Sequence, residues 1–374
     1  MVNEKMRILI IAGGLQIGGA ERVAANISRY APKDEFAFDY IVFEGIENVY
    51  GAEIESDGGR VITLPSPAKG YLKYIRTLRT LIAENKYVAV HSHTMFNSGI
   101  NLAVAKLCGV PCRVAHSHTT KTEIRTSATQ KIYESFMRAL IRVSATKLLA
   151  CGVAAGEWMF GKRTFTRKGA VVLNGIDTKA FTFSGELRKK IRSSLKWESD
   201  YIIGHAGSII PLKNQAFLIK LMPQIIKKNP NARLVLLGSG DEENETTLNE
   251  CIKKSAAKER ITMCGAVMNV NEYLNAFDVF VFPSLREGTP LALLEAQTNG
   301  LPCVMSERVP DDAIVTDLVR KATLGNETEW IDAILDSRRT NPEIYAEIME
   351  KNGYDSERSC AIIYDLYRRA EIRE

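Results

Sequence analysis

The sequence VFVFPSLREGTPLALLEAQTNGLPCVMS, residues 279–306, predicts a strand, a loop, a helix and a second strand in succession. Two short apolar runs are typical of strands buried on both faces, Val279–Phe282 and Cys303–Met305. Thr289 suits the N-cap of the intervening helix and Pro290 its first position, so we expect that helix over Leu291–Thr298. A strand, a crossover helix and a further strand indicate an α/β fold with a parallel sheet.

Two carboxylates flank the predicted helix start. Glu287 lies in the loop at the carboxyl end of the first strand, and Glu295 follows eight residues later in the second turn of the helix. Open α/β sheets bind ligands at that edge, and the free N–H groups of a helix start attract an anion such as phosphate. A sugar nucleotide carries hydroxyl groups at both ends and a negative centre, so it fits this arrangement. The alternative is a surface loop followed by a helix with a solvated Glu295.

The same segment resembles a known family of enzymes. Pro283-Ser284, Glu287-Gly288, Pro290, Glu295-Ala296 and Gly300-Leu301-Pro302 are similar to the E-x7-E signature of the retaining GT-B glycosyltransferases called family 4. The resemblance extends over nearly the whole chain and is strongest to the subgroup that builds bacterial capsular and exopolysaccharides. It implies two Rossmann-like parallel-sheet domains facing across a cleft, with a C-terminal helix that crosses back to the first domain.

The composition is that of a two-domain globular protein. With 374 residues and 45% apolar residues, the chain is long enough for two cores. Lys and Arg exceed Asp and Glu by 49 − 44 = 5, too small an excess to indicate nucleic acid as a partner. The seven scattered cysteines are expected to be reduced. Without a signal peptide or a long apolar run, the sequence predicts a cytoplasmic protein.

Strands and helices alternate through both halves. The expected strands of the first half are Arg7–Ala12, Phe38–Phe43, Val61–Leu64, Val88–Ser92, Arg113–His116, Lys147–Gly152 and Ala170–Leu173. Those of the second half are Tyr201–Ala206, Arg233–Leu237, Ile261–Cys264, Val279–Phe282 and Cys303–Met305. Asn174-Gly-Ile-Asp177 is similar to the family's turn between domains. We therefore expect one domain over 1–178 with 355–374 and a second, nucleotide-sugar-binding domain over 179–354.

A glycine-rich turn follows the first expected strand. Gly13 to Gly19 allow a ligand to approach the backbone closely, and Asp39 follows twenty residues after Gly19. A dinucleotide site is the alternative, but the glycines run G-G-x-x-x-G-G and Asp39 stands near the start of its strand. In the family, Gly18 and Gly19 match the loop over the donor diphosphate.

Four of the five histidines follow the ends of two strands, as His91-Ser-His93 and His116-Ser-His118. A metal site is one interpretation, but no acidic or cysteine ligand nearby completes either pair. The family instead places a histidine against the donor sugar; His118 is the first candidate and His116 the second. The sequence contains no D-x-D, which argues against a nucleotide site built on a divalent metal. We expect no cofactor and no metal.

Residues 119–149 are long and basic, with an apolar series at helical spacing. The basic residues are Lys121, Arg125, Lys131, Arg138, Arg142 and Lys147, and the apolar ones are Tyr133, Phe136, Met137, Leu140 and Ile141. Core packing is one explanation for the apolar series. The other is a helix that rests on anionic lipid beside a lipid-linked acceptor, as the family implies.

The loop after Tyr201–Ala206 departs from the family pattern. The family has Arg directly after Gly207 and Lys six residues later, and these cations grip the diphosphate. Lys213 is present, but Ser208 stands at the Arg position. Loss of one charge-assisted contact costs about 1.5–3 kcal/mol. Arg286 is a candidate to supply the positive charge that is missing at position 208.

The resemblance implies transfer of a sugar from a nucleoside diphosphate, expected to be uridine diphosphate, to a lipid-linked glycan with retention of configuration. Glu287, His118 and Lys213 are the expected catalytic residues. The expected donor-binding residues are Gly18, Gly19, Ser208, Lys213, Val267, Gly288, Thr289, Leu291 and Glu295. Two alternatives stay open: a catalytically weakened donor-binding subunit, suggested by Ser208, and a sugar-nucleotide epimerase.

Overall fold

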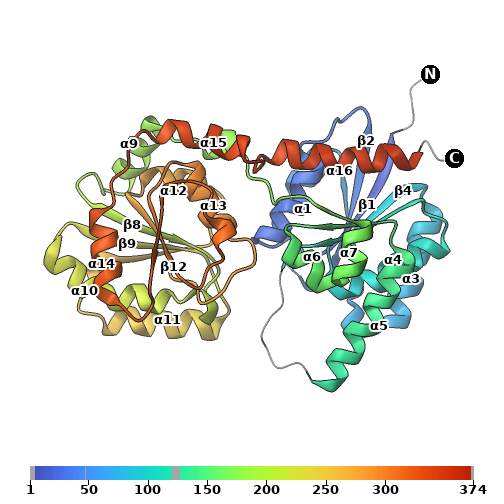
Figure 1. Cartoon of the computed structure of the whole chain (residues 1–374), viewed down its shortest axis with the longest axis horizontal. Helices are drawn as coiled ribbons and strands as arrows, with labels where there is room; N and C mark the ends of the chain where they lie inside the picture. The colour runs from blue at the N-terminus through green and yellow to red at the C-terminus, as the bar shows by residue number, and fades with distance from the viewer. Residues whose placement is uncertain (1–4, 47, 120–126, 372–374) are drawn as a thin grey trace. The chain divides into compact units, whose positions relative to one another are not determined.

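The computed structural model describes residues 5–46, 48–119 and 127–371. The chain forms two compact units (Figure 1). Unit 1 comprises Met1–Gly175 and Ser356–Glu374, and unit 2 comprises Ile176–Asp355. Each unit holds its own parallel sheet, which confirms the predicted fold class of two Rossmann-like α/β domains.

The sheet of unit 1 has seven strands in the order β3-β2-β1-β4-β5-β6-β7, and all neighbouring pairs are parallel. The strands are β1 Met6–Gly13, β2 Phe36–Phe43, β3 Arg60–Leu64, β4 Tyr87–Ser92, β5 Cys112–Ser117, β6 Lys147–Ala150 and β7 Gly169–Val171. The strand order reverses between β1 and β4. In open α/β sheets that reversal is where ligands bind, at the carboxyl ends of the strands.

Helices cover both faces of this sheet. They are α1 Gly19–Arg29, α2 Gly51–Ser56, α3 Tyr71–Glu84, α4 Ser98–Leu107, α5 Ala128–Ser144, α6 Val153–Phe160, α7 Lys162–Lys168 and α16 Ser356–Glu371. The last helix, α16, packs against α1, β4 and β5, so the chain returns to unit 1 as expected. Its Ile363, Tyr364 and Tyr367 are buried in one of the two apolar clusters of the unit.

The sheet of unit 2 has six parallel strands in the order β10-β9-β8-β11-β12-β13. The strands are β8 Tyr201–Ala206, β9 Ala232–Leu237, β10 Ile261–Gly265, β11 Val279–Phe282, β12 Cys303–Ser306 and β13 Val319–Ala322. The helices are α8 Thr178–Phe181, α9 Gly185–Ser194, α10 Gln215–Lys228, α11 Glu242–Lys254, α12 Val270–Ala276, α13 Leu291–Thr298, α14 Glu327–Asp336 and α15 Tyr345–Lys351. Here the strand order reverses between β8 and β11.

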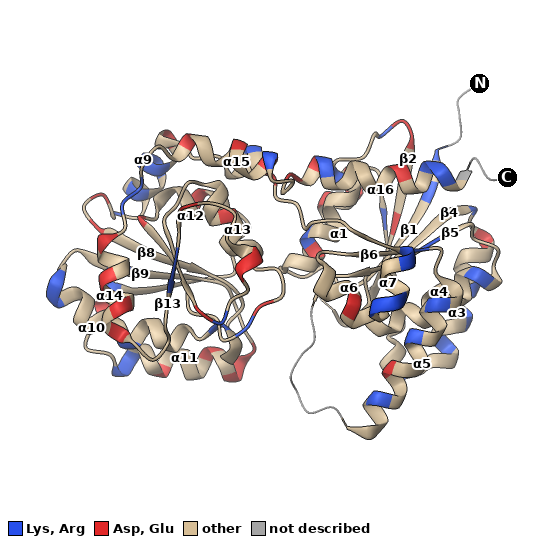
Figure 2. Ribbon diagram, in the orientation of Figure 1, with Lys and Arg blue, Asp and Glu red and all other residues tan. Residues whose placement is uncertain are grey.

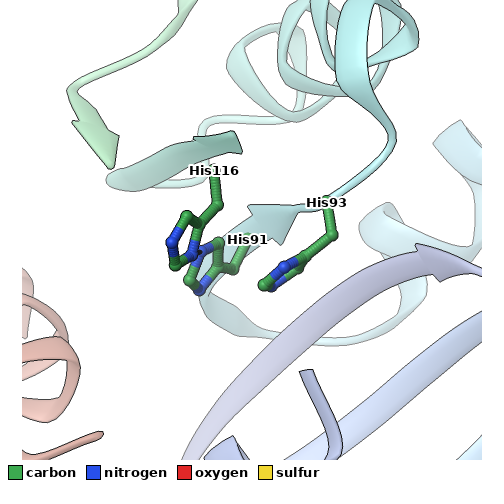
Figure 3. A group of neighbouring side chains, drawn as sticks. All are labelled: His91, His93 and His116. Atoms are coloured by element: carbon green, nitrogen blue, oxygen red, sulfur yellow. Dashed lines mark hydrogen bonds between the residues drawn. The ribbon is translucent and has the colours of Figure 1, made fainter. Parts of the chain in front are cut away.

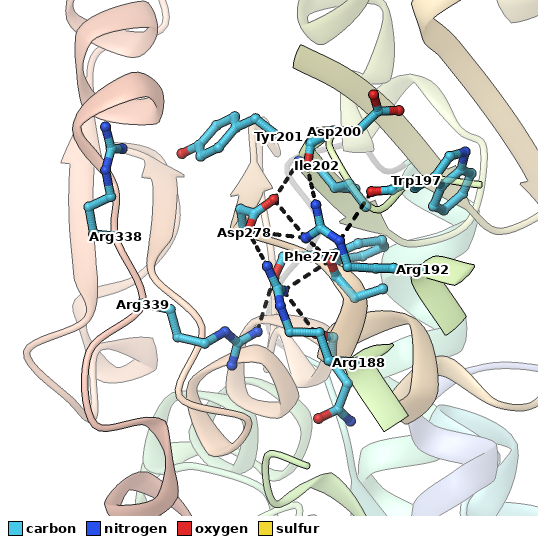
Figure 4. Close-up of polar contacts among 12 residues, drawn as sticks. Arg188, Arg192, Trp197, Asp200, Tyr201, Ile202, Phe277, Asp278, Arg338 and Arg339 are labelled. Atoms are coloured by element: carbon cyan, nitrogen blue, oxygen red, sulfur yellow. Dashed lines mark hydrogen bonds and ion pairs between the residues drawn. The ribbon is translucent and has the colours of Figure 1, made fainter. Parts of the chain in front are cut away.

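A buried ion-pair network holds the start of β11 beside β8 (Figure 4). Asp278, the residue before β11, accepts hydrogen bonds from Arg188 and Arg192 and from the Ile202 amide of β8, the last at 2.7 Å. Arg188 also donates to three carbonyl groups at the end of α12, where a cation is favourable. The network fixes Asp278 and therefore the start of β11, the strand that leads to the loop carrying Glu287.

Most of the apolar residues predicted at helical spacing in α5 pack into the core of unit 1. Met137 and Ile141 are buried, and Tyr133 and Leu140 pack against the same core, whereas Phe136 is exposed. The basic residues Lys121 and Arg125 lie outside the described residues. Over the part of the chain that the structure describes, no helix combines the length and apolar character needed to cross a membrane.

Candidate functional site

Two loops meet at the carboxyl edge of the unit 2 sheet. One follows β8 and the other follows β11, the two strands between which the order reverses. The Leu285 amide donates to the Leu212 carbonyl at 2.8 Å, and the Asn214 side chain donates to the Pro283 carbonyl at 3.2 Å. These contacts hold the loops together where an α/β sheet is expected to bind its ligand.

Lys213 and Glu287 are in direct contact at this edge. The Lys213 Nζ atom lies 2.7 Å from Glu287 Oε1, and their side chains are 20% and 9% exposed. The ammonium also lies over the Phe282 ring, 5.2 Å from its centroid. An ammonium has three N–H donors, so two remain for an anionic ligand. The sequence placed both residues in one site without indicating that they touch.

The start of α13 differs from the prediction. Pro290, not Thr289, is the N-cap residue, and it makes no side-chain cap hydrogen bond because proline carries no polar side chain. The Leu291 amide donates to the Thr289 carbonyl at 3.0 Å, so it is not free for an anion as predicted. Among the described residues, the amides of Gly288, Thr289 and Ala292 have no recorded partner. Two of the free amides, those of Gly288 and Thr289, therefore precede the helix, and the third, that of Ala292, belongs to its second residue.

Glu295 lies in the second turn of α13, as predicted. It and Ala292 are only partly buried, whereas the helix residues between and around them are buried. Residues three apart share a helix face, so Ala292 and Glu295 both lie on the more open face of α13. That places a carboxylate one helical turn from the free amides.

The loop after β8 packs against the loop after β9 without room for a side chain. A Cβ atom added to Gly238, whose φ is +133°, would lie 2.0 Å from the Gly207 carbonyl oxygen. Ser208 follows Gly207 and is exposed, and its carbonyl accepts a hydrogen bond from the Gln215 side chain at 2.8 Å. Val267, after β10, packs partly buried against the core of unit 2. Arg286 is partly buried, and within the described residues no ion pair of it is recorded.

His205 is a component of this edge that the sequence analysis did not single out. It lies inside the apolar run of β8 and is fully buried. Its Nδ1–H donates to the Val281 carbonyl at 2.9 Å, so its Nε2 carries a lone pair, and that atom has no partner among the described residues. Burial and, to a smaller extent, nearby Lys213 lower the pKa of His205 to about 4, although the hydrogen bond to Val281 raises it. Its position within an apolar strand gave no signal of a polar site.

In unit 1, the glycine-rich turn ends at the N-terminus of α1. Gly18 is the N-cap residue in extended conformation and Gly19 is the first helical residue. A Cβ atom on Gly18 would lie 2.3 Å from a carboxylate oxygen of Glu21, so this carboxylate folds back over the turn. Burial raises the pKa of Glu21. In this conformation the Glu21 carboxylate occupies the space that a side chain at Gly18 would take.

The four histidines of β4 and β5 form one cluster in unit 1. His91 Nε2 lies 3.2 Å from His116 Nδ1, and His93 Nδ1 lies 2.7 Å from His118 Nε2. Burial lowers the pKa of His91 to about 3 and of His118 to about 4, and it also lowers the pKa values of His93 and His116. His118 is partly exposed whereas His116 is 1% exposed, so His118 is the more accessible candidate.

The two units and their sheet-edge loops match known proteins. Residues 17–180 match the family described as Glycosyltransferase Family 4, and residues 200–337 match Glycosyl transferases group 1. A putative glycosyltransferase, EpsF, of Bacillus subtilis (strain 168) is 32% identical over 376 residues, covering 98% of this chain and 97% of that protein. A UDP-Gal:alpha-D-GlcNAc-diphosphoundecaprenol alpha-1,3-galactosyltransferase of Escherichia coli is 26% identical, with 94% of each chain covered.

The fold likeness extends to solved structures. The crystal structure of Anabaena Alr3699/HepE in complex with UDP matches with a TM-score of 0.78 at 18% identity, covering 97% of this chain and 99% of that one. Two parallel-sheet units of this kind constitute the GT-B fold. The chain belongs to glycosyltransferase family 4.

Proposed function

We propose that this enzyme transfers a sugar from a uridine diphosphate sugar to a lipid-linked glycan in exopolysaccharide or capsule synthesis, with retention of anomeric configuration. The observation that carries the proposal is the Lys213–Glu287 ion pair at the strand-order reversal of unit 2. Its relatives support the chemistry: the E. coli enzyme is named for a UDP-galactose donor and a diphosphoundecaprenol acceptor. A capsular polysaccharide glycosyltransferase, CapH of Staphylococcus aureus, is 24% identical over 85% of this chain.

The donor diphosphate is assigned to the cation and the free amides of this edge. The ammonium of Lys213 supplies positive charge, and the amides of Gly288, Thr289 and Ala292 supply donors without charge. Because Lys213 provides the charge that a divalent ion supplies in other enzymes, the donor site is proposed to be metal-independent. Glu295 would accept hydrogen bonds from the ribose hydroxyl groups.

The remaining roles are carried over from the family resemblance. Ser208 would donate one hydrogen bond to a phosphate, and Val267 would lie beside the base. Gly18, Gly19 and His118 belong to unit 1, and their contributions remain predictions. Both ring nitrogens of His118 already have partners, His93 and Asn174. For His118 to act on the sugar through a nitrogen, it would have to exchange one of these partners for the donor.

Transfer breaks the bond between the anomeric carbon and the diphosphate oxygen. The acceptor hydroxyl oxygen forms the new bond to that carbon, and its proton passes to the departing diphosphate. Positive charge develops on the sugar as the first bond breaks, and the Glu287 carboxylate stabilises it. Lys213 stabilises the negative charge that develops on the leaving diphosphate. The ion pair thus places one group of each sign where the two charges separate.

A transfer assay tests the proposal. The full chain is incubated with UDP-glucose, UDP-galactose or UDP-N-acetylglucosamine and an undecaprenyl-diphosphate sugar, and products are separated by mass spectrometry. Glu287→Gln should lower turnover by at least a hundredfold, because removal of one preorganised electrostatic group costs about 2.7–4 kcal/mol. Asp332→Asn, an exposed change in unit 2, is the control. Undiminished turnover in Glu287→Gln would contradict the assignment.

The same assay separates the two alternatives. UDP binding without transfer to any acceptor would indicate a donor-binding subunit. Conversion of one UDP-sugar into another without an acceptor would indicate an epimerase. Product in which the new bond has the opposite anomeric configuration to the donor would contradict retention.

We also propose that unit 1 contacts an anionic membrane on the cytoplasmic side through α5. Ile132, Phe136 and Val143 lie on one face of this helix and are 70%, 59% and 60% exposed. Lys131 and Arg142 flank them and are exposed as well. Figure 2 shows further Lys and Arg residues on the neighbouring α7. Exposed apolar side chains beside basic ones suit the interface of a bilayer that carries a lipid-linked acceptor.

Vesicle sedimentation tests this surface. Vesicles containing phosphatidylglycerol should sediment the parent chain, and the double variant Ile132→Ser with Phe136→Ser should sediment at least fivefold less. Met268→Ser, at a 51% exposed methionine of unit 2, serves as the control. Equal sedimentation of the α5 variant and the parent would remove α5 from the contact.

A further inference from the structure

Three histidines of the unit 1 cluster, His91, His93 and His116, have no role in the donor chemistry proposed above, and two of them keep a ring nitrogen without a partner among the described residues. Figure 3 shows His91, His93 and His116 gathered at the ends of β4 and β5. One ring nitrogen from each of the three lies within 4.8 Å of the other two. His93 Nε2 and His116 Nε2 are buried and have no partner among the described residues.

The protonation of His93 follows from the chain of hydrogen bonds behind it. Asn174 Oδ1 can only accept, so His118 Nδ1, at 3.2 Å, is the donor. A neutral imidazole carries one proton, so His118 Nε2 is an acceptor. His93 Nδ1, at 2.7 Å from it, therefore holds the His93 proton. The unpartnered His93 Nε2 consequently carries a lone pair, which is what a metal ion requires.

His91 and His116 have the spacing of two ligands of one ion. With a Zn–N bond of about 2.05 Å, two nitrogens of a tetrahedral site lie about 3.3 Å apart. His91 Nε2 and His116 Nδ1 lie 3.2 Å apart. Coordination by His116 through Nδ1 replaces only its contact with His91, and coordination through Nε2 replaces no contact.

Outer partners already orient two of the three rings. Tyr367 Oη lies 2.7 Å from His91 Nδ1 and His118 Nε2 lies 2.7 Å from His93 Nδ1. A metal-ligating histidine usually makes such a bond with its second nitrogen, which fixes the ring and the tautomer.

We propose that His91, His93 and His116 form a site for one divalent transition-metal ion of the class that prefers imidazole, such as Zn²⁺ or Co²⁺. Three protein ligands leave a fourth position open. The expectation of no metal rested on the lack of an acidic or cysteine ligand near either His-x-His pair. The fold brings the two pairs together, so the third ligand comes from the neighbouring strand. The proposed ligands all belong to unit 1, whereas Lys213 and Glu287 belong to unit 2.

A cobalt titration tests this site. The full chain, without a histidine tag, is treated with a chelator, desalted and titrated with Co²⁺ at pH 7.5 while the visible spectrum is recorded. The expected result is uptake of one ion per chain with the intense absorption of four-coordinate cobalt, reversed by Zn²⁺. Zn²⁺ should also raise the melting temperature of the parent chain.

Variants locate the ligands. His93→Gln and His116→Gln should each weaken Co²⁺ binding at least tenfold, whereas His205→Gln, a change at the buried histidine of unit 2, should bind as the parent does. Circular dichroism confirms that each variant is folded. Absence of a cobalt spectrum in the parent chain at millimolar Co²⁺ would overturn the proposal, whatever the variants do. Unchanged binding in both folded variants would overturn it as well.

Discussion

Acid should weaken unit 2 through His205, and the effect can be isolated with His205→Gln. This histidine is fully buried, and its pKa is lowered from the ordinary value of about 6.5 to about 4. A base whose pKa is lowered in the folded state binds a proton more readily in the unfolded chain. Stability is therefore complete above about pH 6.5 and is lost as the pH falls toward about 4.

The magnitude follows from the two pKa values. At pH 4.5 proton binding stabilises the unfolded histidine by about 3 kcal/mol and the folded one hardly at all. The difference, about 2–3 kcal/mol, is the stability that is lost through His205 between pH 7.5 and pH 4.5. Glutamine keeps an N–H for the Val281 carbonyl and does not titrate, so this part of the loss should vanish in His205→Gln.

Amide hydrogen exchange measures the effect locally. Exchange in peptides that cover β8 and β11 is recorded at both pH values and corrected for the intrinsic rate, because global unfolding of two units need not be two-state. The parent should lose about 2–3 kcal/mol more opening free energy than His205→Gln over this interval. Equal losses in the two proteins would refute the reasoning that His205 is held neutral by burial.

Three further changes probe the frame of the donor site. Gly238→Ala places a Cβ atom 2.0 Å from the Gly207 carbonyl oxygen and should lower the free energy of unfolding, measured in urea, by about 2 kcal/mol or more. The control Gly185→Ala meets nothing within 4 Å and should leave the free energy of unfolding almost unchanged. Equal effects of the two changes would contradict the close packing of Gly238 against Gly207. Asp278→Asn leaves Arg188 and Arg192 without their carboxylate and should lower the free energy of unfolding by about 3 kcal/mol. Asp332 belongs to an exposed ion pair, so the control Asp332→Asn should lower it by less than about 0.5 kcal/mol. Ser208→Arg restores the cation of the family pattern and should tighten UDP binding about tenfold by calorimetry, and an unchanged affinity would show that this position does not reach the phosphates.

The sequence predicted the buried strands well because they are continuous apolar runs. Val279–Phe282 and Tyr201–Ala206 have the same bounds in the structure as in the prediction. The strand β13 was not predicted, because Val319-Arg-Lys-Ala322 lies at the edge of the sheet and alternates little in polarity. Helices α2, α6, α7, α8 and α9 were also missed, since they are short or predominantly polar.

The residues of the candidate site could be predicted from local sequence, but the contacts between them could not. Glu287 and Lys213 were identified from spacing and resemblance, but their contact spans 74 residues of sequence and depends on β8 and β11 being neighbours. The helix start was assigned to Thr289 because its hydroxyl is a common cap, yet the chain turns one residue later at Pro290. The sequence also predicted that the four histidines gather at the ends of two strands, but not which ring nitrogens meet, because that depends on the register of β4 and β5.

The central claim is that Lys213 holds the donor diphosphate at the edge of the unit 2 sheet. The most direct test is isothermal calorimetry of UDP binding to the parent, to Lys213→Met and to Lys220→Met, whose lysine pairs with Glu327 on the surface. Loss of one charge-assisted contact is worth about 1.5–3 kcal/mol, so Lys213→Met should bind UDP at least tenfold more weakly. Lys220→Met should bind as the parent does. Equal UDP affinity in Lys213→Met and the parent would contradict the account.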